Sequence, residues 1–159
     1  MSDEIAQDAA ADATPAHFFE LFNEIGIINQ LATTEFSRVL PHGLTNAQFS
    51  ILNHCVRLGD NKTPARLAAA FQITRGTLTS TLQRLEAKGF IELVPDAHDG
   101  RSKRVLLTES GRQARADAVE AAVTGLAHMQ AALRPKDLAT LLPILKALRL
   151  WLDNNRSGS

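Results

Sequence analysis

Three cationic side chains near residue 100 are the residues of this chain best suited to binding an anion. They are Arg101, Lys103 and Arg104, and Asp99 lies two residues before the first of them. Guanidinium and ammonium groups bind phosphate oxygens through charge-assisted hydrogen bonds, and a carboxylate beside an arginine can orient it. Charges this dense need a counter-anion, which a DNA backbone or a narrow minor groove would supply. The alternative is an exposed loop with ordinary surface charges.

A second group of polar residues follows a helical spacing from Thr74 onwards. Leu78, Leu82 and Leu85 recur at i, i+4 and i+7 and therefore share one face. The opposite face is small and polar, which suits a helix that reads base edges in a major groove. The residues on and beside that face are Thr74, Arg75, Gly76, Thr77, Thr79, Ser80, Gln83 and Arg84. The alternative is an amphipathic surface helix whose Thr- and Ser-rich side faces solvent.

Two short helices and a hairpin are predicted to position these residues. Thr63 and Pro64 supply an N-cap and a first-turn proline for one helix. Gly89 is expected to end the next helix, because glycine is the residue that best tolerates the left-handed conformation there. The apolar, β-prone runs 90–94 and 105–107 then flank the cationic loop. A helix, a turn, a second helix and a basic hairpin in this order are typical of a winged helix-turn-helix that binds DNA.

Long amphipathic helices are predicted on both sides of this region. An apolar stripe with a period near that of an α-helix runs over residues 15–40. Thr108 caps a second long helix that continues to about Leu133, and Pro135 begins a final helix that Pro143 should kink. The leucine-rich surface of the final helix is too broad for a monomer to cover, so we expect a two-fold interface between copies. The alternative is an intramolecular bundle.

Three segments of the chain resemble the MarR (multiple antibiotic resistance regulator) family. They are residues 44–49, 82–91 and 99–111, and the sharpest match is an Asp-x-Arg wing followed by Leu-Thr-x-x-Gly. The resemblance implies a homodimeric bacterial transcription factor, usually a repressor, whose recognition helices bind a palindromic operator. On that pattern Arg101 enters the minor groove and Asp99 supports it. The wing residues assigned to DNA are Asp99, Arg101, Ser102, Lys103 and Arg104.

One part of the wing departs from the family pattern. Many relatives carry an arginine in the first wing strand, where this chain has Leu93-Val94-Pro95. One backbone contact that is common in the family is therefore expected to be absent.

The resemblance also implies a small-molecule effector, commonly a phenolic or other aromatic acid, bound between the dimerisation helices and the DNA-binding region. Aromatic walls combined with cationic or hydrogen-bonding groups would suit such a carboxylate. The candidate residues are Phe36, Arg38, His42, Phe49, Asn53, His54 and Arg57. The alternative is that these phenylalanines are simply core residues.

The predicted fold class is mainly α with a small β-hairpin wing, an α+β winged helix-turn-helix with long dimerisation helices. The expected segments are a disordered acidic tail (1–14), an N-terminal dimerisation helix (15–44), the DNA-binding region (45–108), C-terminal dimerisation helices (109–153) and a disordered tail (154–159).

Charge is unevenly distributed although the formal net charge is zero. Residues 1–56 hold seven acids and one base, residues 57–115 hold eleven bases and six acids, and residues 116–159 hold five bases and four acids. Positive charge is therefore concentrated in the segment assigned to DNA on independent grounds.

Other classes of function receive little support from the sequence. Cys55 is the single cysteine and is expected to be a buried structural thiol, and the five histidines lack metal-ligand spacing, so we expect neither a metal nor a cofactor. No nucleophile motif or phosphate-binding glycine loop is present, so we do not expect an enzyme. The chain has no apolar stretch long enough to span a membrane and no signal-peptide pattern, so a cytoplasmic protein is expected.

Two hypotheses remain for the function. The first is a homodimeric regulator, a repressor that binds double-stranded DNA at a palindromic operator and is released by a small aromatic or phenolic acid. The alternative is a winged-helix protein-interaction module that binds no operator. Salt dependence separates them, because each phosphate contact that is neutralised steepens the fall of affinity with salt.

Overall fold

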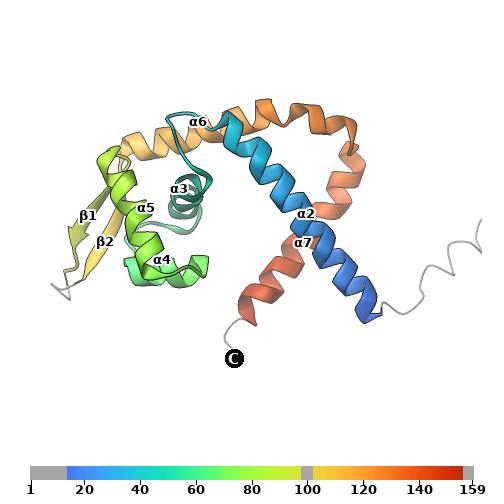
Figure 1. The fold of residues 1–159 in the computed structure, drawn as a ribbon, viewed down its shortest axis with the longest axis horizontal. Helices are drawn as coiled ribbons and strands as arrows, with labels where there is room; N and C mark the ends of the chain where they lie inside the picture. The colour runs from blue at the N-terminus through green and yellow to red at the C-terminus, as the bar shows by residue number, and fades with distance from the viewer. Residues whose placement is uncertain (1–13, 98–101, 156–159) are drawn as a thin grey trace, which may run out of the picture. The chain divides into compact units, whose positions relative to one another are not determined.

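The computed structural model describes residues 14–97 and 102–155 of the chain (Figure 1). The chain divides into two compact units, one extending to Ala122 and one beginning at Val123. Helix α6, Glu109–Gly125, begins in the first unit and ends in the second. The other elements of the first unit are α2 (Pro15–Val39), α3 (Asn46–Leu58), α4 (Pro64–Phe71), α5 (Arg75–Ala87), β1 (Ile91–Pro95) and β2 (Lys103–Leu107).

The core of the first unit forms where α3, α4, α5 and the hairpin pack together. Leu78, Leu82 and Leu85 of α5 are all buried, which confirms the predicted apolar face of that helix. Leu67 of α4 and Val105 of β2 are also fully buried. Burial of these side chains is the main force that holds the two short helices against the hairpin, because helices of this length are marginal in isolation.

Threonine caps set the starts of the helices where the sequence predicted them. The Thr63 hydroxyl accepts a hydrogen bond from the Arg66 amide, and the Thr74 hydroxyl accepts one from the Thr77 amide. Each cap satisfies a backbone N–H that has no partner inside its helix. At the other end, α5 is followed by Gly89 with a φ of +71°. The predicted left-handed glycine after α5 is therefore confirmed.

The two strands form an antiparallel hairpin with Ile91 opposite Leu107 and Pro95 opposite Lys103. The loop before α4 adds to this sheet, because Lys62 forms an isolated bridge with Val105. The Asn61 amide donates to the Val105 carbonyl at 2.7 Å, and the Val105 amide donates to the Lys62 carbonyl at 3.0 Å. The hairpin is thus tied to the start of the helix-turn-helix.

Helix α6 is shorter than the sequence suggested. The hydroxyl of Thr108 caps it by accepting from the Gly111 amide at 3.0 Å, as predicted, but the α-helix ends at Gly125 and not near Leu133. A 3₁₀ segment, η2 (Ala127–Ala131), follows. Glycine has low helix propensity, and the His128 ring nitrogen lies 3.0 Å from the Gly125 carbonyl oxygen, which the end of the helix leaves without a partner.

The second unit consists of the end of α6, η2 and helix α7 (Pro135–Asn154). Pro135 begins α7, as predicted, and the helix continues through Pro143. The kink expected at Pro143 stays a prediction. No helix among the described residues is both apolar enough and long enough to cross a lipid bilayer.

Candidate nucleic-acid interface

The polar face of α5 is exposed along its length, opposite the buried leucines. All eight residues that the sequence placed there or beside it, Thr74, Arg75, Gly76, Thr77, Thr79, Ser80, Gln83 and Arg84, are exposed. Two threonine hydroxyls of the helix donate to carbonyls one turn earlier, Thr79 to Arg75 at 2.8 Å and Thr81 to Thr77 at 3.0 Å. Their oxygen lone pairs can still accept hydrogen bonds from a partner.

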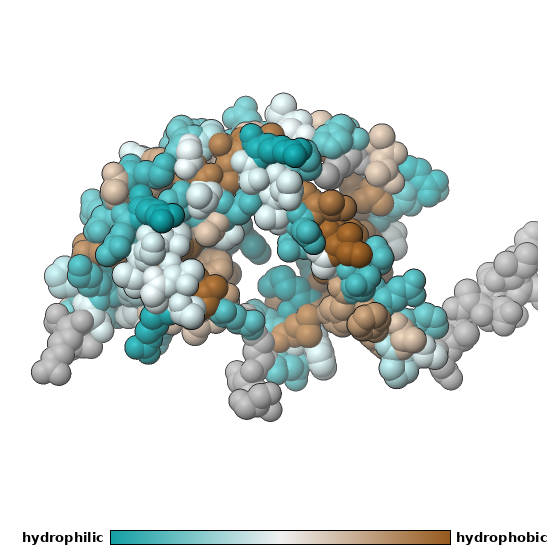
Figure 2. Space-filling model, in the orientation of Figure 1, coloured by the Kyte–Doolittle hydropathy of each residue, from teal (hydrophilic) through white to brown (hydrophobic). Residues whose placement is uncertain are grey.

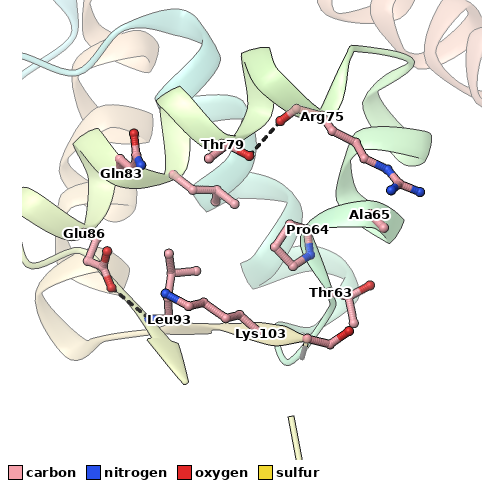
Figure 3. A pocket seen from close by; sticks show the side chains of 11 residues that line it. Thr63, Pro64, Ala65, Arg75, Thr79, Gln83, Glu86, Leu93 and Lys103 are labelled. Carbon is pink, nitrogen blue, oxygen red and sulfur yellow. Dashed lines mark hydrogen bonds between the residues drawn. The ribbon is translucent and has the colours of Figure 1, made fainter. Parts of the chain in front are cut away.

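A concave surface lies between α4, α5 and the wing, which is the hairpin of β1 and β2 (Figure 3). Its volume is about 490 Å³. Arg75 and Gln83 belong to its lining on α5, and Lys103 lies along the hairpin on the opposite side. Glu86 closes one end, where its carboxylate accepts a hydrogen bond from the Leu93 amide at 3.3 Å. The described residues that line it are Thr63, Pro64, Ala65, Arg75, Thr79, Leu82, Gln83, Glu86, Leu93, Ser102 and Lys103.

The fold therefore places residues of the helix and of the wing on one surface. Thr79 and Gln83 are separated from Lys103 by some twenty residues of sequence, yet they line the same concavity. Hydrogen-bonding side chains from a helix, flanked by cations from a second element, are the groups that contact base edges and phosphates respectively.

The cations of the wing differ in their surroundings. Lys103 is exposed, whereas the Arg104 side chain is 30% exposed and donates from Nε to Asp96 Oδ2 at 2.8 Å. Arg104 also donates from Nη1 to the Asn61 carbonyl at 2.8 Å. Asp99 and Arg101, the other wing residues assigned to DNA, lie outside the described residues.

Sequence reasoning missed Asp96. The signal that could have identified it is the hairpin register, because Val94 pairs with Arg104 and Asp96 is therefore the diagonal neighbour of Arg104. The Asp96 side chain is 6% exposed, so its charge must be compensated inside the protein.

Comparisons with known proteins agree with the geometry. A sequence profile described as MarR family matches residues 42–102. The "Transcriptional activatory protein BadR" of Rhodopseudomonas palustris is 33% identical over 114 residues, which are 68% of this chain and 63% of BadR. The "Multiple antibiotic resistance protein MarR" of Escherichia coli is 34% identical over 100 residues, which are 58% of this chain and 69% of that protein. The chain belongs to the MarR family.

Solved structures show the same relation for the fold. A crystal structure of a mutant MarR from E. coli complexed with operator DNA has a TM-score of 0.67 and 28% identity, and it covers 83% of this chain and 95% of that chain. The transcriptional regulator BldR from Sulfolobus solfataricus has a TM-score of 0.72 and 25% identity, and it covers 87% of this chain and 96% of that chain. This MarR-family chain is accordingly a transcriptional regulator with a winged-helix fold, and not an enzyme.

The effector residues expected from the sequence are distributed over several contacts in this MarR-family chain. Phe36 and Phe49 pack edge to face with ring centroids 4.8 Å apart. The His42 ring lies 2.6 Å from the Asp117 carboxylate, and Asn53 accepts two hydrogen bonds from Arg115. Arg38 pairs with Glu35 on α2, and Arg57 is exposed at the end of α3. None of the seven residues lines the concave surface between α5 and the wing.

Two titratable groups of α3 have shifted pKa values. Burial lowers the pKa of His54, and the nearby charges of Lys62 and Arg57 lower it further. Burial raises the pKa of the Cys55 thiol to about 11, with a further increase from the charge of Asp60. The Cys55 side chain is buried, as the sequence predicted. Within residues 14–97 and 102–155, no three His, Cys, Asp or Glu side chains gather closely enough to hold a metal ion.

Proposed function

We propose that this chain is a homodimeric transcription factor that binds a palindromic operator with α5 in the major groove and the wing beside it. The observation that carries the proposal is the single concave surface shared by Arg75, Thr79 and Gln83 of the helix and by Ser102 and Lys103 of the wing. The relation to an E. coli MarR crystallised with operator DNA supports it. The proposed contacts are Thr74, Arg75, Gly76, Thr77, Thr79, Ser80, Gln83 and Arg84 from the helix, with Asp99, Arg101, Ser102 and Lys103 from the wing.

Dimerisation is supported by apolar surface that a single chain leaves uncovered. Neither α2 nor α7, both fully described, contains a buried residue. Hydrophobic residues lie at the surface (Figure 2). On α2 the exposed large ones are Phe18, Phe19, Leu21, Phe22, Ile27, Ile28 and Leu31, and on α7 they are Leu138, Leu141, Leu142, Ile144, Leu150, Trp151 and Leu152. Exposed apolar surface of this extent marks an interface, and a two-fold dimer would match a palindrome.

The experiment is a titration of the purified protein against genomic fragments at several salt concentrations, followed by footprinting. A DNA-binding protein should show log K falling with log salt, with a slope of about −0.9 per phosphate contact. Lys103→Gln should make this slope shallower by about 0.9, as expected for the loss of one phosphate contact. Lys136→Gln, which removes the same charge from an exposed position on α7, is the matched control and should leave the slope unchanged. Salt-independent affinity with no operator-sized footprint would favour the protein-interaction module instead.

We further propose that bound operator represses the adjacent promoter and that a small aromatic acid releases the protein. BadR carries the description of an activatory protein, so the direction of regulation needs its own test. In a reporter strain, deletion of the protein should raise expression of the promoter beside the footprint, and a fall would show activation. A thermal-shift screen of aromatic acids, repeated with operator present, tests for the effector. The chain would act in the cytoplasm, where the DNA is.

A further inference from the structure

Arg104 has a different environment from its neighbour Lys103. Successive side chains of a strand point to opposite faces, so Lys103 and Arg104 diverge. Lys103 lines the concave surface beside α5, and the described lining of that surface does not include Arg104. Arg104 instead directs two of its N–H groups to Asp96 and to the carbonyl of Asn61.

The two partners of Arg104 lie in different parts of the fold, one at the end of the hairpin and the other in the loop before α4. Asp96 is the first residue after β1, and its amide donates to the Ser102 carbonyl at 2.9 Å, which closes the hairpin loop. Asn61 belongs to the loop before α4 and has a φ of +62°. One guanidinium therefore joins the end of the hairpin loop to the start of the helix-turn-helix.

Charge also distinguishes Arg104 from a phosphate ligand. The carboxylate of Asp96 lies 2.8 Å from Arg104 Nε and is 6% exposed, whereas the Arg104 side chain is 30% exposed, so a mostly buried carboxylate offsets the charge of the cation. A neutralised pair attracts a phosphate only weakly, since the two opposite charges nearly cancel at the distance of the DNA. Lys103, which is exposed, is better placed to neutralise a phosphate.

We propose that Arg104 and Asp96 form a positioning pair that fixes the wing relative to α4 and α5, and that Arg104 is not itself a phosphate contact. The inference rests on the proposed operator binding and assigns different roles to two wing cations: Lys103 contacts phosphate, and Arg104 positions the wing. Operator affinity then depends on Arg104 through the geometry of the hairpin.

Whether a single substitution at Asp96 raises or lowers operator affinity distinguishes the two roles of Arg104. Asp96→Asn removes a negative charge near DNA and replaces the charged acceptor of Arg104 Nε with a neutral amide oxygen. If Arg104 contacts phosphate, Asp96→Asn should tighten binding, because a more positive surface attracts the operator. If Arg104 positions the wing, Asp96→Asn should weaken binding, and the double variant Asp96→Asn/Arg104→Gln should be about as weak as either single variant, because residues of one pair act as a unit.

The assay is fluorescence anisotropy of the full-length protein with the footprinted duplex across a range of salt concentrations. Arg104→Gln and Asp96→Asn should each weaken binding roughly tenfold without changing the salt slope. Lys103→Gln, the matched loss of a neighbouring cation, should reduce the slope by about 0.9. Amide hydrogen exchange should become faster at position 96 and at Asn61 in both pair variants and stay unchanged in Lys103→Gln. Thermal midpoints and the active fraction from stoichiometric titration check that each variant is folded.

Tighter binding by Asp96→Asn, or a salt slope reduced by about 0.9 in Arg104→Gln, would overturn the inference. Unchanged affinity in both pair variants would overturn it as well. If Arg104→Gln fails to fold, the nearly isosteric Asp96→Asn decides the question by its sign alone. Failure of the unmodified protein to bind any duplex would refute the proposed function as well as this inference, and the unmodified protein is always measured first.

Discussion

Gly111 occupies a position where even one added methyl group should be costly. It is buried in the first turn of α6, and a Cβ built there would fall on the carbonyl oxygen of Phe90 and lie 2.9 Å from Leu107 Cδ1. The Phe90 carbonyl is backbone and cannot rotate away as a flexible side chain could. Gly111→Ala must therefore displace α6 from the segment that joins α5 to β1.

The free energy of that displacement can be worked out from the contacts it disturbs. Overpacking a close contact costs about 1–3 kcal/mol. The Thr108 amide donates to the Phe90 carbonyl at 3.2 Å, and the Thr108 hydroxyl donates to the Gly89 carbonyl at 2.7 Å. Loss of these bonds adds about 1 kcal/mol each. These terms sum to about 3–5 kcal/mol, and the higher helix propensity of alanine offsets about 1 kcal/mol of that. The net cost of about 2–4 kcal/mol corresponds to a fall of roughly 4–16 °C in the thermal midpoint for a chain of this size.

Gly76→Ala is the matched control for the same chemical change. A Cβ at Gly76 meets only Thr74 Oγ1, at 3.9 Å, so it fits without displacing anything. Because alanine has the higher helix propensity, Gly76→Ala should raise stability by roughly 0.5–1 kcal/mol. Urea unfolding of both variants at one fixed protein concentration measures the two changes. A Gly111→Ala variant as stable as the unmodified protein, or a Gly76→Ala variant that loses as much stability, would refute the steric reasoning.

Three further predictions concern other parts of the chain. The pKa of Cys55 is raised from 9.0 to about 11, so about a hundredfold less thiolate forms at pH 8. An aromatic disulfide reagent should therefore modify Cys55 in the folded protein at least a hundredfold more slowly than in the urea-unfolded chain. Equal rates would contradict this. The pKa of His54 is lowered from 6.5 by burial, Lys62 and Arg57, so the unfolded chain binds this proton at higher pH and the contribution of His54 becomes destabilising as pH falls below about 6.5. The thermal midpoint of His54→Asn should accordingly fall less than that of the unmodified protein between pH 6.5 and 5, and parallel curves would argue against it. Phe22→Asp places a charge in the exposed apolar face of α2. Sedimentation should show the dimer dissociation constant raised by more than about a hundredfold, because each copy loses roughly 1.5–3 kcal/mol from burial of the side chain. An unchanged dissociation constant would remove α2 from the interface.

The helix boundaries around α5 could be predicted from the sequence because their signals are local. Thr63 before Pro64, Thr74 at the next start and Gly89 after the last turn each act on backbone groups within four residues of themselves. The spacing of the three leucines fixed which side of α5 faces the core for the same reason. Local geometry alone decides which atoms such residues can reach.

The end of α6 was mispredicted because the apolar pattern continued past the helix. Residues such as Leu126 and Leu133 maintained the spacing, but Gly125 carried the stronger local signal. The contact of Arg104 with Asn61 and the partners of Asn53 and His42 could not be foreseen, because those partners lie far away along the sequence. Arg104 binds Asn61, 43 residues away, and the His42–Asp117 and Asn53–Arg115 contacts span 75 and 62 residues.

The sequence by itself determined a polar helix, a basic hairpin and the order that joins them, because capping, periodicity and turn chemistry act over a few neighbouring residues. Only the tertiary structure decided that Gln83 and Lys103 line one concave surface, and that Arg104 is engaged by Asp96 while Lys103 is exposed. Such contacts depend on how the helix and the hairpin pack around the buried leucines, and packing brings together side chains whose separation along the chain carries no signal of their contact.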